Sequence, residues 1–155
     1  DSLGYLLGDE GSGSYIGKKV VRDFMRGYLP PQLGEKFRMK FRVTNEDVFN
    51  NLYNKPLPNR FLAGFCLFAD VHKDHPHIEG IVEEAFNDFF RNLVSRYPNY
   101  QQYLFNCVGS VGYAFRHILS KVASNYKMST GNILHSPIDN LVIFHQSAAV
   151  SNTKA

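Results

Sequence analysis

The most informative part of this chain of 155 residues is the stretch Gly4-Tyr5-Leu6-Leu7-Gly8-Asp9-Glu10-Gly11-Ser12-Gly13-Ser14-Tyr15-Ile16-Gly17. It begins with a short apolar run between two glycines, which predicts the end of a β-strand. A glycine-rich loop with two carboxylates follows, and apolar residues then recur at helical spacing. Ser12 or Ser14 is predicted to cap this helix and Gly27 to stop it. The first unit is therefore predicted to be strand, glycine-rich loop and helix.

A second strand-to-helix junction lies at Cys107-Val108-Gly109-Ser110-Val111-Gly112. The residues before it predict a buried strand from Tyr103 to Val108, and those after it a helix from Tyr113 to about Ser124. Glycines at such a turn let the backbone approach a flat or anionic ligand closely. The turn is neither a G-x-G-x-x-G fingerprint nor a phosphate loop ending in Gly-Lys-Ser/Thr.

Between the two junctions the sequence predicts mainly helices. Residues 36–43 alternate basic and apolar side chains, which predicts a strand with one basic face, with a helix as the rival interpretation. Residues 44–47 resemble a capping box for a helix that ends at Tyr53. Further predicted elements are helices from Asn59 and from Pro76, a strand between Lys127 and Leu134, and a helix from Ile138 to Gln146. The order predicts an α/β fold in which several helices cover a small mixed sheet.

Composition and charge exclude several classes of protein. Hydrophobic residues make up 44% of the chain and charged residues 20%, so intrinsic disorder is excluded. The net charge is +3 and the basic residues are scattered, which gives no support to nucleic-acid binding. The longest apolar stretch, Phe61 to Ala69, is too short to span a membrane. Two cysteines favour a reducing compartment, and we expect the cytoplasm. The start, Asp1-Ser2-Leu3-Gly4, leads us to expect a preceding segment.

Three groups of side chains could carry chemistry. Asp9 and Glu10 could accept hydrogen bonds from sugar hydroxyls, or they could be capping acids of a surface turn, and the sequence leaves both interpretations open. A histidine cluster between two helices could hold zinc or nickel, but no distant residue completes a tetrahedral set, so we expect no metal site. The cluster comprises His72, His75 and His77, with Asp70 and Asp74 nearby. Cys66 and Cys107 stand in apolar runs and are predicted to be packed thiols rather than nucleophiles.

The two glycine junctions together resemble a known family. The Gly-Asp-Glu-Gly-Ser sequence at residues 8–12 resembles the signature of the N-acetylglucosamine kinase branch of the BadF/BadG-type ATPases, within the actin-like ATPase and sugar kinase superfamily. Residues 60–66 look like the family's helix that follows this signature, and residues 106–112 are similar to its adenosine motif. Residues 136–140 match its closing Ser-Pro-x-x-Gly segment loosely, with Asn140 in place of glycine. Relatives often have Gly-Trp-Gly where this chain has Ser2-Leu3-Gly4.

This resemblance implies a role for individual residues. Asp9 is expected to contact an amino sugar, with Gly4 and Gly13 lining the sugar pocket through their backbone. The nucleotide is expected to be held by Gly109, Ser110 and Ala114, with Ala63 against the adenosine. The expected cofactors are ATP and Mg²⁺, and no partner other than the sugar substrate is implied, although a homodimer is allowed.

The resemblance also implies that residues 1–155 are the C-terminal lobe of an actin-like (ribonuclease H-like) fold. The family's Asp-Gly-Gly-Gly-Thr phosphate loop and catalytic aspartate do not occur in these residues, so we expect no catalytic residue here and no turnover by this chain alone. The expected function of the parent protein is ATP-dependent phosphorylation of N-acetylglucosamine or a related N-acetylhexosamine, with N-acetylmuramic acid and glucosamine left open. The alternatives are an activator ATPase of the BadF type and a non-catalytic sugar- or nucleotide-binding module.

Overall fold

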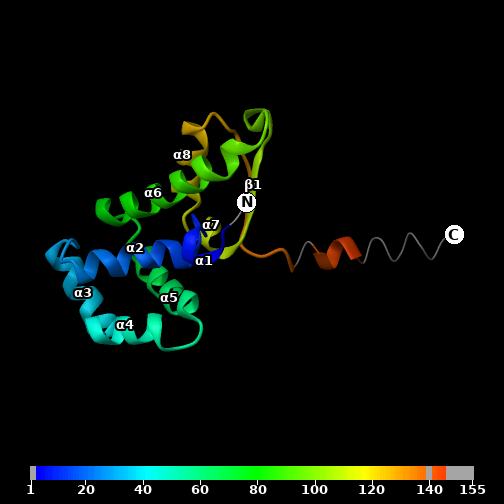
Figure 1. Ribbon diagram of the computed structural model, residues 1–155. Helices are drawn as coiled ribbons and strands as arrows, with labels where there is room; N and C mark the ends of the chain where they lie inside the picture. Colours follow the sequence, from blue (N-terminus) through cyan, green and yellow to red (C-terminus); the bar gives the residue numbers. More distant parts are fainter. Residues whose placement is uncertain (1–2, 139–140, 146–155) are drawn as a thin grey trace.

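The computed structural model describes residues 3–138 and 141–145, and it shows an α/β protein in which helices predominate (Figure 1). The helices are α1 (Gly4–Leu7), α2 (Gly13–Met25), α3 (Pro31–Phe41), α4 (Asn45–Tyr53), α5 (Pro58–Val71), α6 (Pro76–Asn92), α7 (Ser110–Ala114) and α8 (Arg116–Asn125). Two short 3₁₀ turns, Val94–Arg96 and Tyr100–Gln102, follow α6. The strands are β1 (Phe105–Val108) and β2 (Thr130–Leu134). Residues 141–145 are also helical.

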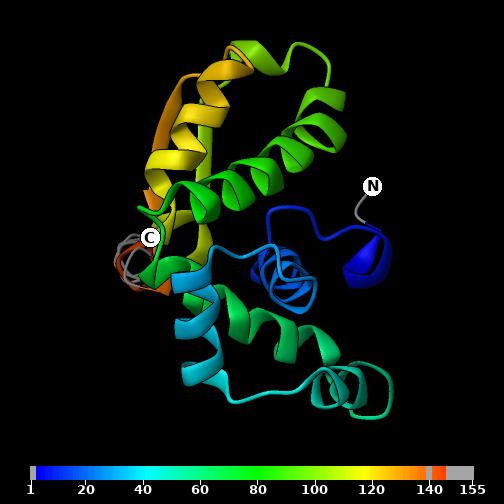
Figure 2. The same ribbon diagram turned by 90° about the vertical axis from the view of Figure 1, so that its left-hand side faces the viewer.

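Helix α2 lies between α6 and α5, as both views of the ribbon show (Figures 1 and 2). The Ser12 hydroxyl caps α2 by accepting a hydrogen bond from the Tyr15 amide at 3.1 Å, as one of the two predicted caps. Gly27 follows the end of the helix with a φ of +69°, the left-handed conformation that glycine adopts most readily. Sequence therefore predicted both ends of α2 correctly.

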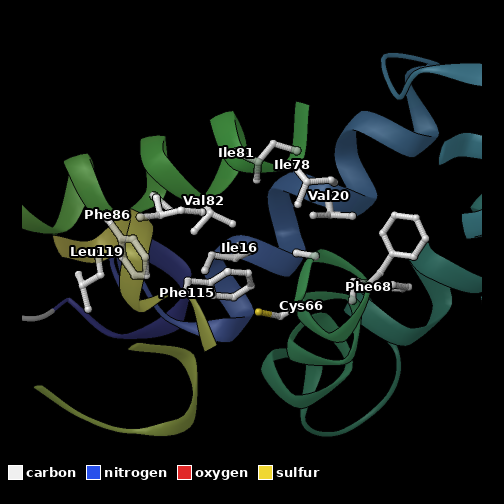
Figure 3. Close-up of a cluster of buried hydrophobic side chains, with 14 of the residues drawn as sticks. Ile16, Val20, Cys66, Phe68, Ile78, Ile81, Val82, Phe86, Phe115 and Leu119 are labelled. Atoms are coloured by element: carbon white, nitrogen blue, oxygen red, sulfur yellow. The ribbon is translucent and has the colours of Figure 1, made fainter. Parts of the chain in front are cut away.

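The core lies where α2, α5, α6 and α8 meet (Figure 3). Ile16 and Val20 of α2 are fully buried, and in Figure 3 the side chains of Ile78 and Val82 on α6 point toward them. Phe115, just before α8, is buried against the same cluster. Burying this apolar surface holds the two glycine junctions at the ends of rigid helices.

Strands β1 and β2 pair in parallel and are joined by α7 and α8, so they form a βαβ unit. Phe105 pairs with Thr130 and Cys107 with Ile133. The predicted small mixed sheet is thus a two-stranded parallel sheet within the described residues. Both strands are shorter than predicted, and β1 alternates half-buried and exposed residues instead of being buried throughout.

Two predicted strands are helices. The run before Gly8 is the single turn α1, closed by the Gly8 amide donating to the Gly4 carbonyl at 2.8 Å. Residues 36–43 fall mostly in α3, because burial there follows a spacing of four: Leu33 and Phe37 are buried, whereas Met39 is 61% exposed. The alternation of basic and apolar residues was therefore coincidental, and the rival helical interpretation was the correct one.

The other predicted helices are confirmed, except that the one predicted from Tyr113 to about Ser124 begins at Ser110 and is divided at Phe115 into α7 and α8. Thr44 and Asp47 form the predicted capping box of α4, and α5 and α6 begin at Pro58 and Pro76, at their first turns. Of the predicted helix from Ile138 to Gln146, residues 138 and 141–145 are helical, and residues 139, 140 and 146 lie outside the described residues. Among the described residues no helix is long and apolar enough to cross a membrane.

Candidate functional site

The two glycine junctions, about a hundred residues apart in sequence, meet in space. Residues 10–13 of the first and residues 108–112 of the second line one cavity of about 380 Å³. Its remaining lining includes Phe86, Phe89 and Phe105, so glycine-rich loops and aromatic side chains both contribute to its walls. Gly109 has a φ of +148°, which places the start of α7 in a conformation that favours glycine.

A second cavity of about 490 Å³ shares part of this lining and contains most of the predicted nucleotide residues. Ala63 from α5 and Ser110 and Ala114 from α7 line it together, and so does Gly13. A volume of this size is ordinary for a small-molecule site. The structure thus brings Ala63, Ser110 and Ala114 to one place, and Gly109 to the neighbouring cavity.

Gly13, which was predicted for the sugar, stands between the two junctions. A Cβ atom on Gly13 would lie 3.7 Å from the Ala63 Cβ and 3.5 Å from the Val111 Cγ2. These are ordinary contact distances, so the backbone of the first loop packs directly against the walls of the second cavity. The predicted sugar residue and the predicted nucleotide residues are therefore neighbours.

The second cavity also has polar and aromatic walls that sequence reasoning missed. Lys73 donates to Asp70 Oδ1 at 3.0 Å and to the Ala114 carbonyl at 3.2 Å, which ties the end of α5 to α7. The Arg116 guanidinium lies 5.0 Å from the centre of the Tyr113 ring, and His135 contacts that ring edge-on at 5.5 Å. One of these residues could have been found from the sequence, because Tyr113 directly follows the second glycine turn.

Asp9 is held by a local cluster of hydroxyl groups. Its Oδ2 accepts hydrogen bonds from Ser12 Oγ at 2.7 Å and from Ser14 Oγ. Its backbone has a φ of +67°, an uncommon conformation that aspartate tolerates better than most residues. Within the described part of the chain no hydrogen bond reaches Asp9 Oδ1, so the second carboxylate oxygen has no polar partner there. Asp9 lines neither of the two cavities above.

Gly4 lies at the start of α1, away from both cavities. Its φ is +71°, and a Cβ atom there would meet nothing within 4 Å. Leu6 and Leu7, on the same turn, are 74% and 80% exposed. The structure therefore does not bring Gly4 into contact with the other predicted site residues.

Long-range polar contacts with α6 fix the first loop and α2. The Tyr15 hydroxyl donates to Asp88 at 2.8 Å, and buried Lys19 bridges to Glu84 at 3.0 Å. Burial, followed by the Asp88 contact, raises the pKa of the Tyr15 hydroxyl, which keeps it a donor. Asn92 donates to Glu10 Oε1 at 3.0 Å, which joins the first loop to the end of α6.

The three clustered histidines have separate partners. His72 Nδ1 lies 2.9 Å from the Phe68 carbonyl, His75 Nδ1 accepts from the His77 amide, and His77 Nε2 lies 3.1 Å from Asp23. Across residues 3–138 and 141–145 no group of three or more His, Cys, Asp or Glu side chains is placed to hold a metal ion.

Both cysteines are packed against apolar neighbours. Burial raises the pKa of the Cys66 thiol to about 12, with a smaller contribution from Asp70, and burial also raises the pKa of Cys107. Neither thiol is activated as a nucleophile or poised as a thiolate ligand.

The two glycine turns that carry the resemblance to sugar kinases thus lie around adjoining cavities of an α/β fold. The chain is similar to a crystal structure described as that of the "Putative N-acetylglucosamine Kinase" from Porphyromonas gingivalis, with 37% sequence identity and a TM-score of 0.89. The match covers 95% of this chain and 52% of that one, so this chain spans about half the length of that protein. No family model and no curated protein sequence matches the chain. The predicted resemblance to the N-acetylglucosamine kinase-like branch is confirmed by this likeness in sequence and fold.

Proposed function

We propose that the full-length protein transfers a phosphoryl group from ATP to a hydroxyl of an amino sugar, with N-acetylglucosamine or a related N-acetylhexosamine as the substrate. The observation that carries the proposal is the cavity of about 490 Å³ in which Ala63, Ser110 and Ala114 come together. These are three of the four residues that the family resemblance assigns to the nucleotide. The likeness to a protein described as an N-acetylglucosamine kinase supports the same reaction.

We propose that the nucleotide occupies this cavity. Its small residues, Gly13, Ala63, Ser110 and Ala114, leave room for a flat base and ribose. Lys73 is paired with Asp70 in the same wall, so Arg116 supplies the net positive charge of the lining. A positively charged side chain in the wall favours binding of an anionic ligand. ATP would supply the phosphoryl group, and this chain would contribute binding and orientation.

We propose that the sugar is bound at Asp9, through the free oxygen Oδ1. A carboxylate oxygen accepts a hydrogen bond from a sugar hydroxyl, and such charge-assisted bonds are stronger than neutral ones. Asp9 is close to the nucleotide cavity in the sequence, because Gly13, which lines that cavity, follows Asp9 by four residues. The acceptor hydroxyl and the phosphoryl donor would therefore approach from neighbouring surfaces.

The catalytic base, the phosphate loops and the Mg²⁺ ligands belong in this proposal to a second, N-terminal lobe, with residues 1–155 forming the C-terminal lobe of an actin-like fold. Exposed apolar residues on α1 and just before it support this arrangement, because Leu3, Leu6 and Leu7 are each more than 60% exposed. Clustered apolar exposure of this kind is typical of surfaces that another part of a protein covers. The proposed setting is the cytoplasm.

An activator ATPase, the alternative that holds an iron–sulfur cluster through cysteines, is disfavoured. Cys66 is only 7% exposed, and burial keeps its thiol protonated. A cluster shared between subunits needs accessible thiolates.

Calorimetric titration of the full-length protein tests the proposal. We expect ATP to bind, and N-acetylglucosamine to bind more tightly when ATP is present, because neighbouring sites couple. Saturable binding of neither ligand at millimolar concentration would contradict the proposed function.

A further inference from the structure

The hydroxyl of Ser14 forms a hydrogen bond with the carboxylate of Asp9. Ser14 is 8% exposed, and its Oγ donates to Asp9 Oδ2 and lies 3.0 Å from the Ser12 Oγ. The Ser12 hydroxyl donates to the same carboxylate oxygen at 2.7 Å. Two hydroxyl groups thus converge on a single oxygen atom of Asp9.

This arrangement fixes the direction of the other oxygen. Asp9 has a left-handed backbone, with a φ of +67°, and a residue in that conformation needs support from its surroundings. The Ser12 amide supplies part of it by donating to the Asp9 carbonyl at 3.1 Å. With Oδ2 held by two donors, rotation of the carboxylate is restricted and Oδ1 keeps one orientation.

The two serines do different work. Ser12 also accepts a hydrogen bond from the Tyr15 amide, so it caps α2 as well as holding Asp9. Ser14 is already inside α2, and among the described residues its hydroxyl contacts only Asp9 and Ser12. Removing the Ser14 hydroxyl therefore affects the carboxylate and leaves the helix cap in place.

Glu10, the other acidic residue of this loop, has a different hydrogen-bond partner. Glu10 Oε1 accepts a hydrogen bond from Asn92 at 3.0 Å, which joins it to α6 and not to the serines. Among the described residues, Asp9 is the carboxylate of this loop that accepts hydrogen bonds from hydroxyl groups, and it accepts them through Oδ2 alone.

We propose that Ser14 is a positioning residue, which orients the Asp9 carboxylate so that Oδ1 meets a hydroxyl of the amino sugar. This inference rests on the proposed function, because it assigns Asp9 Oδ1 to the sugar. Ser14 itself does not touch the substrate. It acts on sugar recognition through Asp9 and has no contact with the nucleotide.

Steady-state kinetics of the full-length protein test the inference. We expect Ser14→Ala to raise the KM for the amino sugar about tenfold and to leave the KM for ATP unchanged. Ser95→Ala is the control, because the Ser95 hydroxyl donates only to the Arg91 carbonyl, outside the loop. Ser12→Ala should produce the same change in sugar KM together with a lower melting temperature, since it also removes the cap.

A double-mutant cycle separates positioning from a structural role. If Ser14 acts through Asp9, adding Ser14→Ala to Asp9→Asn should change the sugar KM less than about twofold. Effects that multiply in the double variant would overturn the inference, because they would show that Ser14 acts independently of Asp9.

Amide hydrogen exchange distinguishes failure of the inference from failure of the proposed function. Exchange at the Ser12 amide, which donates to the Asp9 carbonyl, should be faster in Ser14→Ala than in wild type. If wild type phosphorylates no amino sugar, the proposed function fails whatever the exchange shows, and the substrate part of the inference fails with it. If wild type is active but Ser14→Ala changes neither the exchange nor the sugar KM, only the inference about Ser14 is wrong.

Discussion

A Cβ atom on Gly17 of α2 would lie 1.9 Å from the carbonyl oxygen of Leu62 in α5, so the two helices cross at backbone contact. No side chain larger than hydrogen fits there, because the obstacle is backbone and cannot rotate away. This crossing carries the first glycine loop, at the start of α2, to the side of Ala63 on α5.

Gly17→Ala should therefore destabilise the protein by about 3 kcal/mol or more, as overpacking against a rigid neighbour does. Gly80→Ala is the matched control, since Gly80 is an exposed position of α6 with nothing within 4 Å of its Cβ. That variant should gain about 0.5–1 kcal/mol from helix propensity. Chemical denaturation measures both, and equal stability of Gly17→Ala and wild type would show that the crossing is looser than described.

The capping box of α4 should make a measurable contribution to stability. The Asp47 amide donates to Thr44 Oγ1 at 3.1 Å, and the Thr44 amide donates back to the Asp47 carboxylate at 2.9 Å. Thr44→Ala should cost about 1 kcal/mol, whereas Thr44→Ser, which keeps the hydroxyl, should cost much less. Similar losses for both variants in urea denaturation would be inconsistent with the cap.

The same box predicts a dependence of stability on pH. Hydrogen bonds from Thr44 hold the pKa of Asp47 below its ordinary value of 3.8. A carboxyl whose folded pKa is lowered stabilises the fold above the unfolded pKa and loses that contribution as the pH falls through the folded value. Wild type should therefore lose more stability between pH 5 and about pH 2 than Asp47→Asn does. Parallel acid denaturation curves for the two proteins would contradict this assignment.

Filling the second cavity should weaken nucleotide binding. Ala63→Leu places three further carbon atoms against the space lined by Ser110 and Ala114, and we expect the Kd for ATP to rise at least about tenfold. Ala63→Ser is of similar size to the native residue and should bind ATP nearly as wild type does. Sugar affinity measured without nucleotide should be unchanged in both. Normal ATP binding by Ala63→Leu would show that the nucleotide does not occupy this cavity.

The buried thiol of Cys66 should react slowly. Because burial raises the pKa of Cys66 to about 12, its thiol stays protonated at pH 8, and Cys107 is shifted in the same direction. A thiol reagent should label Cys66 in the native full-length protein far more slowly than in guanidinium chloride. Peptide mapping assigns the modified residue, and fast native labelling of Cys66 would contradict its burial.

Sequence patterns predicted the long helices well and the short elements poorly. In α6 the apolar residues Ile78, Ile81, Val82, Ala85 and Phe86 recur at intervals of three and four, which is the period of a helix. The capping box of α4 joins residues only three apart, so the local sequence is enough to predict it. The run before Gly8 is only one turn long, which is too short to distinguish strand from helix by its period. In α3 the alternation of Phe37, Met39 and Phe41 concealed a spacing of four residues, and tertiary burial of Phe37 resolved it.

The candidate site was predictable where it consists of glycine turns. The turns at residues 8–13 and 109–112 imply close backbone approach, and the fold brings them together. Lys73, Arg116 and His135 come from separate elements, and their meeting at the second cavity depends on tertiary packing, which no local pattern records. The support of Asp9 by Ser14 likewise depends on the left-handed backbone of Asp9.

The most direct test of the proposed function is ADP release by the full-length protein with ATP, Mg²⁺ and N-acetylglucosamine, measured beside the isolated chain of residues 1–155. We predict that release by the full-length protein depends on the sugar and yields a sugar phosphate, and that the isolated chain shows no sugar-dependent turnover. Absence of sugar-dependent ADP release by the full-length protein, across N-acetylglucosamine, other N-acetylhexosamines, N-acetylmuramic acid and glucosamine, would contradict amino-sugar phosphorylation. Comparable turnover by both proteins would contradict the assignment of the catalytic base to a second lobe.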